Sequence, residues 1–418
     1  MRDFDEVDNQ MMIGGLSTVD LAEEYDTPLF VTDEGAVREN YRRIRDAFSS
    51  RYPTTIHYAS KANTNMALLR ILEQEGSHID AVSLGEVDTC LQAGFSPDRI
   101  LYTGVSVSDH ELEALVGRGV TINIDSLSQM RRLAGIDTEV PVSFRINPAV
   151  GAGHHEKVVT GAKGSKFGIP KDQVMGAYEE ALELGFEPLG IHAHIGSGGL
   201  EVAPFREVTQ VLASFARQIE EELDLSLRFL DIGGGVGIPY RPEESPLDLE
   251  AVADAVASEM EDCPVPELAI EPGRYIVGDT TLLLARVNDV KETSEKRYIG
   301  VDAGFNILLR PSFYGAYHHV AVANRFGERG ELMYDVVGPI CETGDYLAKD
   351  RLLPRVEEGD LVAVYDAGAY GYVMSSQYNS RPRCREVLVN EGRASLIRER
   401  ESMEDLLRDQ RIPSRLML

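Results

Sequence analysis

The chain has 418 residues, 43% hydrophobic and 26% charged, which is the composition of a globular protein with room for two or three domains. Its net charge of −28 argues against nucleic acid or an anionic membrane as a partner, because both would repel it. No apolar run reaches the roughly 18 residues of a transmembrane helix, and the first residues lack a signal-peptide pattern, so we expect a cytoplasmic protein.

The four cysteines, Cys90, Cys263, Cys341 and Cys384, lie far apart, and their spacing predicts neither a disulfide framework nor a metal site. Acidic residues are spread along the whole chain, and only eight of its 41 basic residues are lysines. Salt-rich cytoplasm favours such a surface, because salt screens self-repulsion while carboxylates keep water bound. We therefore expect a halophilic source; an ordinary acidic protein is the alternative.

The first elements are a short strand, Leu29–Val31, and an amphipathic helix, Glu34–Phe48. From there apolar runs alternate with helical patterns. The expected strands are Ile56–Ser60, Ile79–Ser83, Ile100–Thr103, Thr121–Asp125, Val142–Asn147, Gly190–Ile195, Phe229–Ile232 and Leu268–Glu271. The expected helices between them are Gly85–Ala93, Asp109–Val116, Ser126–Leu133, Lys171–Leu184, Pro204–Leu223 and Leu247–Met260.

Eight strands separated by helices predict an α/β fold, a (β/α)8 TIM-type barrel over residues 33–281. A doubly wound sheet is the alternative, but no strand is followed by a G-x-G-x-x-G fingerprint. After Asp279 short β-type runs follow one another between turn residues, which predicts a second, mostly-β domain. We assign residues 1–32 and 282–418 to it, and we expect the strand at Leu29 to pair there.

Lys61 stands where the first barrel strand ends, in Tyr58-Ala59-Ser60-Lys61-Ala62-Asn63. That end of a barrel strand faces the active site, and a lysine held there can be desolvated for Schiff-base chemistry. A lysine that merely ends a strand in solvent is the alternative. The ends of the other predicted strands favour the Schiff-base interpretation, because they are rich in residue types that bind ligands or take part in catalysis.

Three of these ends suit an aromatic phosphate cofactor. The run Gly233, Gly234 and Gly235 lets backbone N–H groups approach an anion such as a phosphate. His194 and Ser197 offer a ring to stack and a hydroxyl to donate. Glu271 ends an apolar strand, where a carboxylate needs a cation. A protonated pyridine nitrogen would serve, and an ion pair with arginine is the alternative.

Five segments resemble the PLP-dependent decarboxylases of alanine-racemase-like fold. They are Tyr58–Asn63, Ser165–Ile169, His192–Ser197, Asp231–Gly235 and Glu271–Arg274. Two more, Arg310–His318 and Cys341–Asp345, are similar to those of the diaminopimelate decarboxylases. The resemblance runs from about Thr27 to Arg383 with the motifs in the same order.

The resemblance implies roles at the cofactor, pyridoxal 5'-phosphate. Lys61 would carry it as a Schiff base, and His194 would stack on its ring. Glu271 would pair with the ring nitrogen, and Tyr370 would touch the cofactor from the β-rich domain. Its phosphate would be held by Ser197, by the run Gly233–Gly235 and by the backbone of Glu271, Pro272, Gly273 and Arg274.

The resemblance also implies the substrate site. Arg274, Arg310 and Tyr314 would bind the distal carboxylate of meso-2,6-diaminopimelate, with Tyr370 close by, and Glu342 would read the distal ammonium. Cys341 would return the proton after CO2 leaves. In the family, the residues that correspond to Cys341 and Glu342 reach into the active site of a partner subunit, so we expect a homodimer with two shared active sites.

The implied activity is decarboxylation of meso-2,6-diaminopimelate to L-lysine, the last step of lysine biosynthesis. A related decarboxylase for ornithine, arginine or carboxynorspermidine is the alternative within the class. Arg310 and Glu342 would distinguish these substrates from diaminopimelate, because the alternatives lack the distal carboxylate or place it differently. An alanine-racemase-type isomerase would place an arginine where this chain has Glu271. A non-catalytic PLP-binding homologue would be free to lose Lys61 and Cys341. We further expect the segment 151–163 to be a loop over the site.

Overall fold

The structure is a computed structural model that describes residues 2–150 and 165–417, so the loop expected at 151–163 lies outside the described residues. The chain divides into two compact units. Residues 36–277 form one, called the barrel unit here, and residues 1–35 together with 278–418 form the other, called the β unit. The sequence placed these boundaries at residues 32/33 and 281/282.

Eight parallel strands of the barrel unit close on themselves, which confirms the predicted (β/α)8 barrel. The strands in order are β5 (Thr54–Ala59), β6 (His78–Ala81), β7 (Ile100–Tyr102), β8 (Thr121–Ile124), β9 (Val142–Asn147), β11 (Pro188–His192), β12 (Phe229–Asp231) and β13 (Glu267–Ile270). The ring closes where Ala269 of β13 pairs with Thr55 of β5. A two-residue strand, β10 (Ile169–Pro170), extends the sheet from β9.

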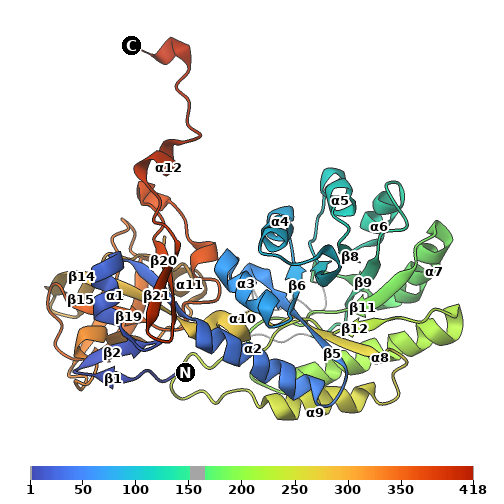
Figure 1. The fold of residues 1–418 in the computed structure, drawn as a ribbon, viewed down its shortest axis with the longest axis horizontal. Helices are drawn as coiled ribbons and strands as arrows, with labels where there is room; N and C mark the ends of the chain where they lie inside the picture. Colours follow the sequence, from blue (N-terminus) through green and yellow to red (C-terminus); the bar gives the residue numbers. More distant parts are fainter. Residues whose placement is uncertain (1, 151–164, 418) are drawn as a thin grey trace. The chain divides into compact units, whose positions relative to one another are not determined.

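Helices follow the barrel strands and lie on the outside of the ring (Figure 1). They are α2 (Glu34–Ser49), α3 (Met66–Gln74), α4 (Leu84–Gln92), α5 (Asp109–Val116), α6 (Leu127–Ala134), α7 (Val174–Leu184), α8 (Ala203–Leu223), α9 (Leu249–Met260) and the short α10 (Arg274–Val277). Ser83 and Ser126 begin α4 and α6 directly after their strands, because each side chain accepts the backbone N–H three residues on. Short capped loops of this kind keep the residues at strand ends in fixed positions.

Several predicted strands run too far at their carboxyl ends. β11 ends at His192 and β13 at Ile270, so His194 and Glu271 lie just beyond the strands rather than within them. The apolar pattern continues past the last ladder hydrogen bond, because the loop residues Ile195 and Ile232 are also buried. Burial alone therefore does not mark where a strand stops.

The β unit contains a sheet in the order β18-β17-β15-β14-β4-β20-β21. The bounds are β4 (Leu29–Asp33), β14 (Thr281–Glu292), β15 (Arg297–Val301), β17 (Leu332–Val337), β18 (Tyr346–Leu353), β20 (Arg385–Asn390) and β21 (Arg393–Arg398). β16 (Val320–Val322) and β19 (Leu361–Val364) pair with each other, and β19 also pairs with β14. Leu29 of β4 pairs with Leu284 of β14, which confirms the predicted role of the early strand.

The remaining elements of this unit are β1 (Glu6–Val7), β2 (Gln10–Ile13), β3 (Leu16–Ser17), α1 (Thr18–Tyr25), α11 (Arg310–Tyr314) and α12 (Met403–Leu407). The sequence did not predict β1, β2, β3, β16, β18 and β21. The run in β18 is broken by Lys349-Asp350-Arg351, and Asp350 has a positive φ of 54°. Across residues 2–150 and 165–417, no helix has both the length and the apolar character needed to cross a membrane.

Candidate active site

Lys61 lies in a 3-10 turn, Ser60–Ala62, directly after β5. Its Nζ forms an ion pair with Asp80 at the end of β6, and Thr103 donates to the same carboxyl group. Burial and nearby Glu271 raise the pKa of Asp80, and Lys61 opposes that rise. The Asp80 side chain is fully buried, whereas the Lys61 side chain is one-third exposed. The lysine thus points its amine into a fixed, charged recess at the predicted end of the barrel.

A second group of side chains lies inside the barrel at the ends of β11, β12 and β13. The ligating atoms of His192, Asp231 and Glu271 lie within 4.8 Å of one another, and all three residues are buried. Burial raises the pKa of Glu271 and holds the pKa of Asp231 well above its ordinary value, while it holds the pKa of His192 well below. Two buried carboxyl groups beside a neutral imidazole form a site for a cation.

The run Gly233–Gly235 passes very close to its neighbours. A Cβ on Gly233, where φ is +71°, would lie 2.5 Å from the carbonyl oxygen of Ala193, so only glycine fits there. The N–H of Gly233 donates to Asp231 (2.7 Å), and the N–H of Gly234 donates to Nδ1 of His194 (3.1 Å). Two of the three N–H groups expected at a phosphate are therefore used within the protein. In the described chain only that of Gly235 is left for an anion.

Arg274, the first residue of α10, is 5% exposed. Its guanidinium donates to Ser197 Oγ (3.0 Å) and to the hydroxyl of Tyr240 (2.6 Å). Before it, Gly273 lets the end of β13 pack on β5, since a Cβ there would lie 3.0 Å from those of Ala59 and Ala62. The structure thus brings Arg274 and Ser197 together, and it adds Tyr240, which no sequence motif singled out.

Arg310 in the β unit is 2% exposed, which is rare for an arginine. Its Nη1 lies 3.5 Å from Nε2 of His318, whose Nδ1 lies 2.8 Å from the carbonyl oxygen of Tyr365. Tyr314 lies one turn further along α11. In the loop after β19, Tyr370 has a φ of +58°, which is strained for a side chain of this size. Such strain is often found at binding sites.

Cys341 and Glu342 lie on an exposed segment between β17 and β18. The thiol of Cys341 contacts Asn379 Oδ1 (3.4 Å), and Tyr378 donates its hydroxyl proton to Glu342. Glu342 also lines a hollow of about 500 Å³ in the β unit. The buried Asp345 fixes this segment, because it accepts the N–H groups of Phe305 and Ile340, both at 2.7 Å.

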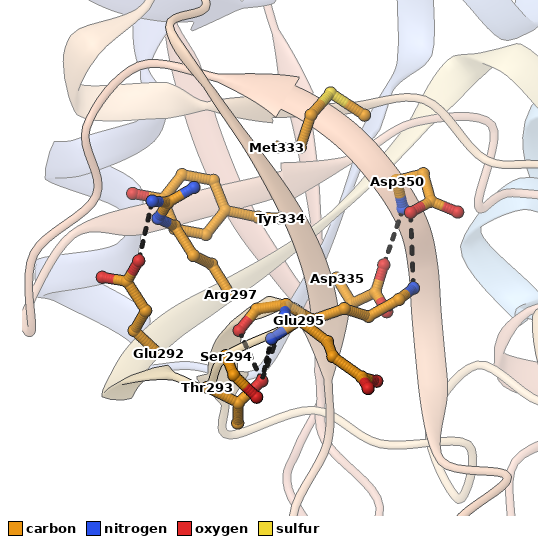
Figure 2. Close-up of a pocket in the computed structure, with 10 residues that line it drawn as sticks. Glu292, Thr293, Ser294, Glu295, Arg297, Met333, Tyr334, Asp335 and Asp350 are labelled. Atoms are coloured by element: carbon orange, nitrogen blue, oxygen red, sulfur yellow. Dashed lines mark hydrogen bonds and ion pairs between the residues drawn. The ribbon is translucent and has the colours of Figure 1, made fainter.

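A second hollow of the β unit, about 210 Å³, lies between the β14–β15 turn and strands β17 and β18 (Figure 2). The ammonium of Lys296 bonds Asp335 (2.7 Å) and Asp350 (3.3 Å), and Arg297 pairs with Glu292. Both cations of this hollow are thus paired with carboxylates of its own wall, and we assign the hollow no ligand.

Sequence reasoning missed Asp80, Arg145, His192, Asp231 and Tyr240 as site residues. Arg145 is 7% exposed, and burial lowers its pKa. A signal was present for the first four, because each is a polar residue within three positions of the carboxyl end of a predicted strand. Tyr240 carried no such signal, because it lies in an irregular segment after β12.

Residues 34–278 match the family model described as pyridoxal-dependent decarboxylase, pyridoxal binding domain. The match covers more than half of the chain. The chain belongs to this decarboxylase family. The family, the fold and the cofactor predicted from the sequence are confirmed.

Relatives in the family are similar over nearly their whole length. The chain is 52% identical to the diaminopimelate decarboxylase of Methanothermobacter thermautotrophicus, with 97% of each chain covered. It is 45% identical to that of Archaeoglobus fulgidus, over 99% of this chain and all of the relative.

Solved structures of the family agree with the fold. The diaminopimelate decarboxylase from M. jannaschi superposes with a TM-score of 0.93 at 32% identity, over 99% of both chains. The one from Helicobacter pylori complexed with L-lysine gives 0.88 at 35%, over 93% of this chain and 98% of the other.

Pyridoxal phosphate fits the residues of the barrel unit. Glu271 has a buried oxygen, Oε1, without a hydrogen-bond partner in the described chain, which is what a protonated ring nitrogen requires. Lys61 lies near enough to lower the pKa of Glu271. Ser197, Arg274 and Gly235 supply donors for a phosphate. The cluster of His192, Asp231 and Glu271 would also suit a metal ion, and family membership favours the ring nitrogen.

Proposed function

We propose that this protein decarboxylates meso-2,6-diaminopimelate to L-lysine and CO2, the last step of lysine biosynthesis. The observation that carries the proposal is the buried, unpaired Oε1 of Glu271 beside Lys61, in a chain 52% identical to a protein named diaminopimelate decarboxylase. We also propose that it works in a salt-rich cytoplasm, on the strength of its acidic, lysine-poor composition, and as a homodimer, because Cys341 and Glu342 are exposed in the single chain.

The cofactor, when bound, supplies an electron sink for the pair of electrons that the departing CO2 leaves behind. Lys61 would bind it covalently through Nζ, and Asp80 would hold that nitrogen whenever it is released and protonated. Glu271 would keep the ring nitrogen protonated. His194 would stack on the ring, while Ser197, Arg274 and the Gly235 N–H would bind the phosphate. These roles follow from the contacts above and from the chemistry of each group.

The distal end of the substrate needs a cation for its carboxylate and an anion for its ammonium. Arg310 suits the first, because its guanidinium is buried and positioned by His318. Tyr314 and Tyr370 would add hydroxyl groups. Arg274 already donates to Ser197 and Tyr240, so it would serve the phosphate first and the carboxylate second. Glu342, on the wall of the larger hollow, would bind the ammonium.

Cys341 would return the proton, so that the bond from carbon to CO2 is replaced by a bond to hydrogen taken from Sγ. Both Cys341 and Glu342 are exposed in the single chain. A proton donor to a reactive carbanion has to work where bulk water is excluded. We therefore propose that a second subunit covers this segment and that each dimer has two shared sites.

The test is an end-point assay in high salt with added pyridoxal phosphate. Meso-diaminopimelate, ornithine and arginine are offered separately, and products are identified by mass. We expect lysine from diaminopimelate and no product from the other two. A diamine from ornithine, or agmatine from arginine, would keep the cofactor chemistry and overturn the assignment of Arg310 and Glu342.

A further inference from the structure

The two carboxylate oxygens of Glu271 have different surroundings. Oε2 lies 3.4 Å from Nε2 of His192, whereas Oε1 is buried without a hydrogen-bond partner in the described residues. The histidine Nε2 likewise has no hydrogen-bond partner there, so it lies beside Oε2 without a formed hydrogen bond. The separation is longer than the common N–H···O distance of about 3 Å, so a small movement would complete the bond.

The other ring nitrogen of His192 is held by a chain of two buried polar side chains. Ser143 Oγ donates to Asn123 Oδ1 (2.9 Å), and Asn123 Nδ2 donates to His192 Nδ1 (2.8 Å). Asn123 and Ser143 are register partners on β8 and β9, and His192 ends β11. β8 and β11 both pair with β9, so the bond from Asn123 to His192 spans that strand.

This chain sets the tautomer of His192. An amide NH2 group only donates, so Nδ1 accepts and the single ring proton of a neutral imidazole is at Nε2. Burial holds the pKa of His192 well below its ordinary value, which makes the ring neutral. The reversed amide would leave the lone pair of Nε2 facing Oε2 of Glu271, which repels an ionised carboxylate.

We propose that His192 is a positioning residue that donates Nε2–H to Oε2 of Glu271 and thereby keeps Oε1 ionised and aimed at the ring nitrogen of the cofactor. The inference rests on the proposed function, since it concerns the same cofactor site. Asn123 and Ser143 act one step further out, by fixing which nitrogen of His192 carries the proton.

The surroundings of Glu271 explain why such a donor is useful. Burial raises the pKa of Glu271, and the nearby cations Lys61 and Arg145 only oppose that rise. A neutral donor stabilises the ionised carboxylate without cancelling its charge. A cationic residue in this position would compete with the ring nitrogen for the same carboxylate, so a neutral histidine serves better than a lysine or arginine.

The test compares two substitutions of the same residue. In His192→Gln the side-chain amide can reach the position of Nε2, and in His192→Asn it reaches only the position of Nδ1. We expect the Asn variant to bind pyridoxal phosphate about ten- to a hundredfold more weakly in reconstitution of the apoenzyme, because a carboxylate loses a donor. The Gln variant should stay within a few-fold of the unsubstituted protein. His57→Gln is the matched control, because His57 is a barrel histidine whose ring lies against that of His78, with 5.3 Å between the ring centroids and 33° between the ring planes.

A cofactor analogue separates this role from general damage. With 1-deaza-pyridoxal phosphate, in which C–H replaces the ring nitrogen, the Asn variant and the unsubstituted protein should bind equally, because nothing remains for Glu271 to pair with. Equal losses for both cofactors would overturn the proposal, and so would a Gln variant as weak as the Asn variant. If the His192 variants do not fold, Asn123→Leu is the deciding variant, because it keeps the imidazole ring but no longer fixes which ring nitrogen carries the proton. We then expect weaker binding of pyridoxal phosphate and unchanged binding of the 1-deaza analogue. Unchanged binding of pyridoxal phosphate would overturn the proposal.

The unsubstituted protein is assayed first in the same experiment. If it binds pyridoxal phosphate but does not release lysine from diaminopimelate, the proposed function fails while the His192 comparison still reports on the cofactor site. If it releases lysine and the His192 variants bind the cofactor as it does, only the inference fails.

Discussion

The strand-end cluster of the barrel unit and the Cys341–Glu342 segment of the β unit differ in how complete they are. Glu271 and His192 are 4% and 1% exposed, and each is held by neighbours from other strands. Cys341 and Glu342 are exposed, and their partners Asn379 and Tyr378 are exposed as well. The barrel is therefore pre-organised for a cofactor by one chain, whereas the proposed proton donor needs something to cover it.

Lys61→Ala should have the largest effect of all, because it removes the residue that attaches the cofactor in the barrel unit. Without Nζ the cofactor has no covalent attachment, so activity should fall by about 10³-fold or more. The measurement is the visible absorbance of the reconstituted protein together with lysine release. Lys171→Ala, on the outside of the same unit, is the control. Covalently bound pyridoxal phosphate in the Ala variant would contradict the assignment of Lys61.

Glu271→Gln keeps the shape of the side chain but removes its charge. Losing one partner of a buried charge pair costs about 3–5 kcal/mol, so we expect a loss of about 10²–10⁴-fold in kcat/KM. Glu267→Gln is the control on the same strand, since Glu267 contacts Thr55 at the other end of β13. If the two variants were equally active, Glu271 would not be the partner of the ring nitrogen.

Cys341→Ala tests the exposed Cys341–Glu342 segment of the β unit. General acid catalysis is worth about 10²–10⁴-fold, and activity should fall within that range. The sharper measurement mixes this variant with Lys61→Ala under conditions that let subunits exchange. If the sites are shared, half of the dimers carry one intact site, so about a quarter of the full activity returns. A mixture as inactive as its components would rule out sharing.

Arg310→Lys keeps the positive charge and loses the planar fork that binds a carboxylate with two hydrogen bonds. We expect KM for diaminopimelate to rise about tenfold or more, with a smaller change in kcat. Arg297→Lys, in the surface pair with Glu292, should leave KM unchanged. A change in kcat alone would argue against a role in binding the distal carboxylate.

The last prediction concerns stability rather than activity. Burial raises the pKa of Asp366 from 3.8 to about 8, with Asp279 adding to the rise and Arg310 and Arg2 opposing it. Between these values the folded chain keeps a proton that the unfolded chain releases, so stability falls as pH rises through this window, by up to about 1.4 kcal/mol per pH unit. Asp366→Asn should flatten the pH dependence of Tm. Asp409→Asn, at an exposed position, is the control, and equal slopes would contradict the expectation.

Chain order was enough to find the eight barrel strands, because parallel strands buried on both faces read as apolar runs between helices. It was also enough to place Lys61 and Glu271 at their carboxyl ends. β18 was not predicted because Lys349-Asp350-Arg351 interrupts its apolar run, although hydrogen bonds to β17 hold it in the sheet. Asp345, which the family comparison gave no reason to choose, proved to fix the segment that carries Cys341.

The sequence by itself determined the family, the barrel and the residue types at each strand end, because these depend on local pattern and on motifs that are contiguous in the chain. Only the tertiary structure decided which of these residues meet. The contact of His192 with Glu271 and the bond from Asn123 to His192 each join residues from strands that flank a common neighbour, so the pairing of the strands into one sheet brings them together. The tautomer of His192 and the charge of Glu271 then follow from burial and from hydrogen bonds between side chains on different strands.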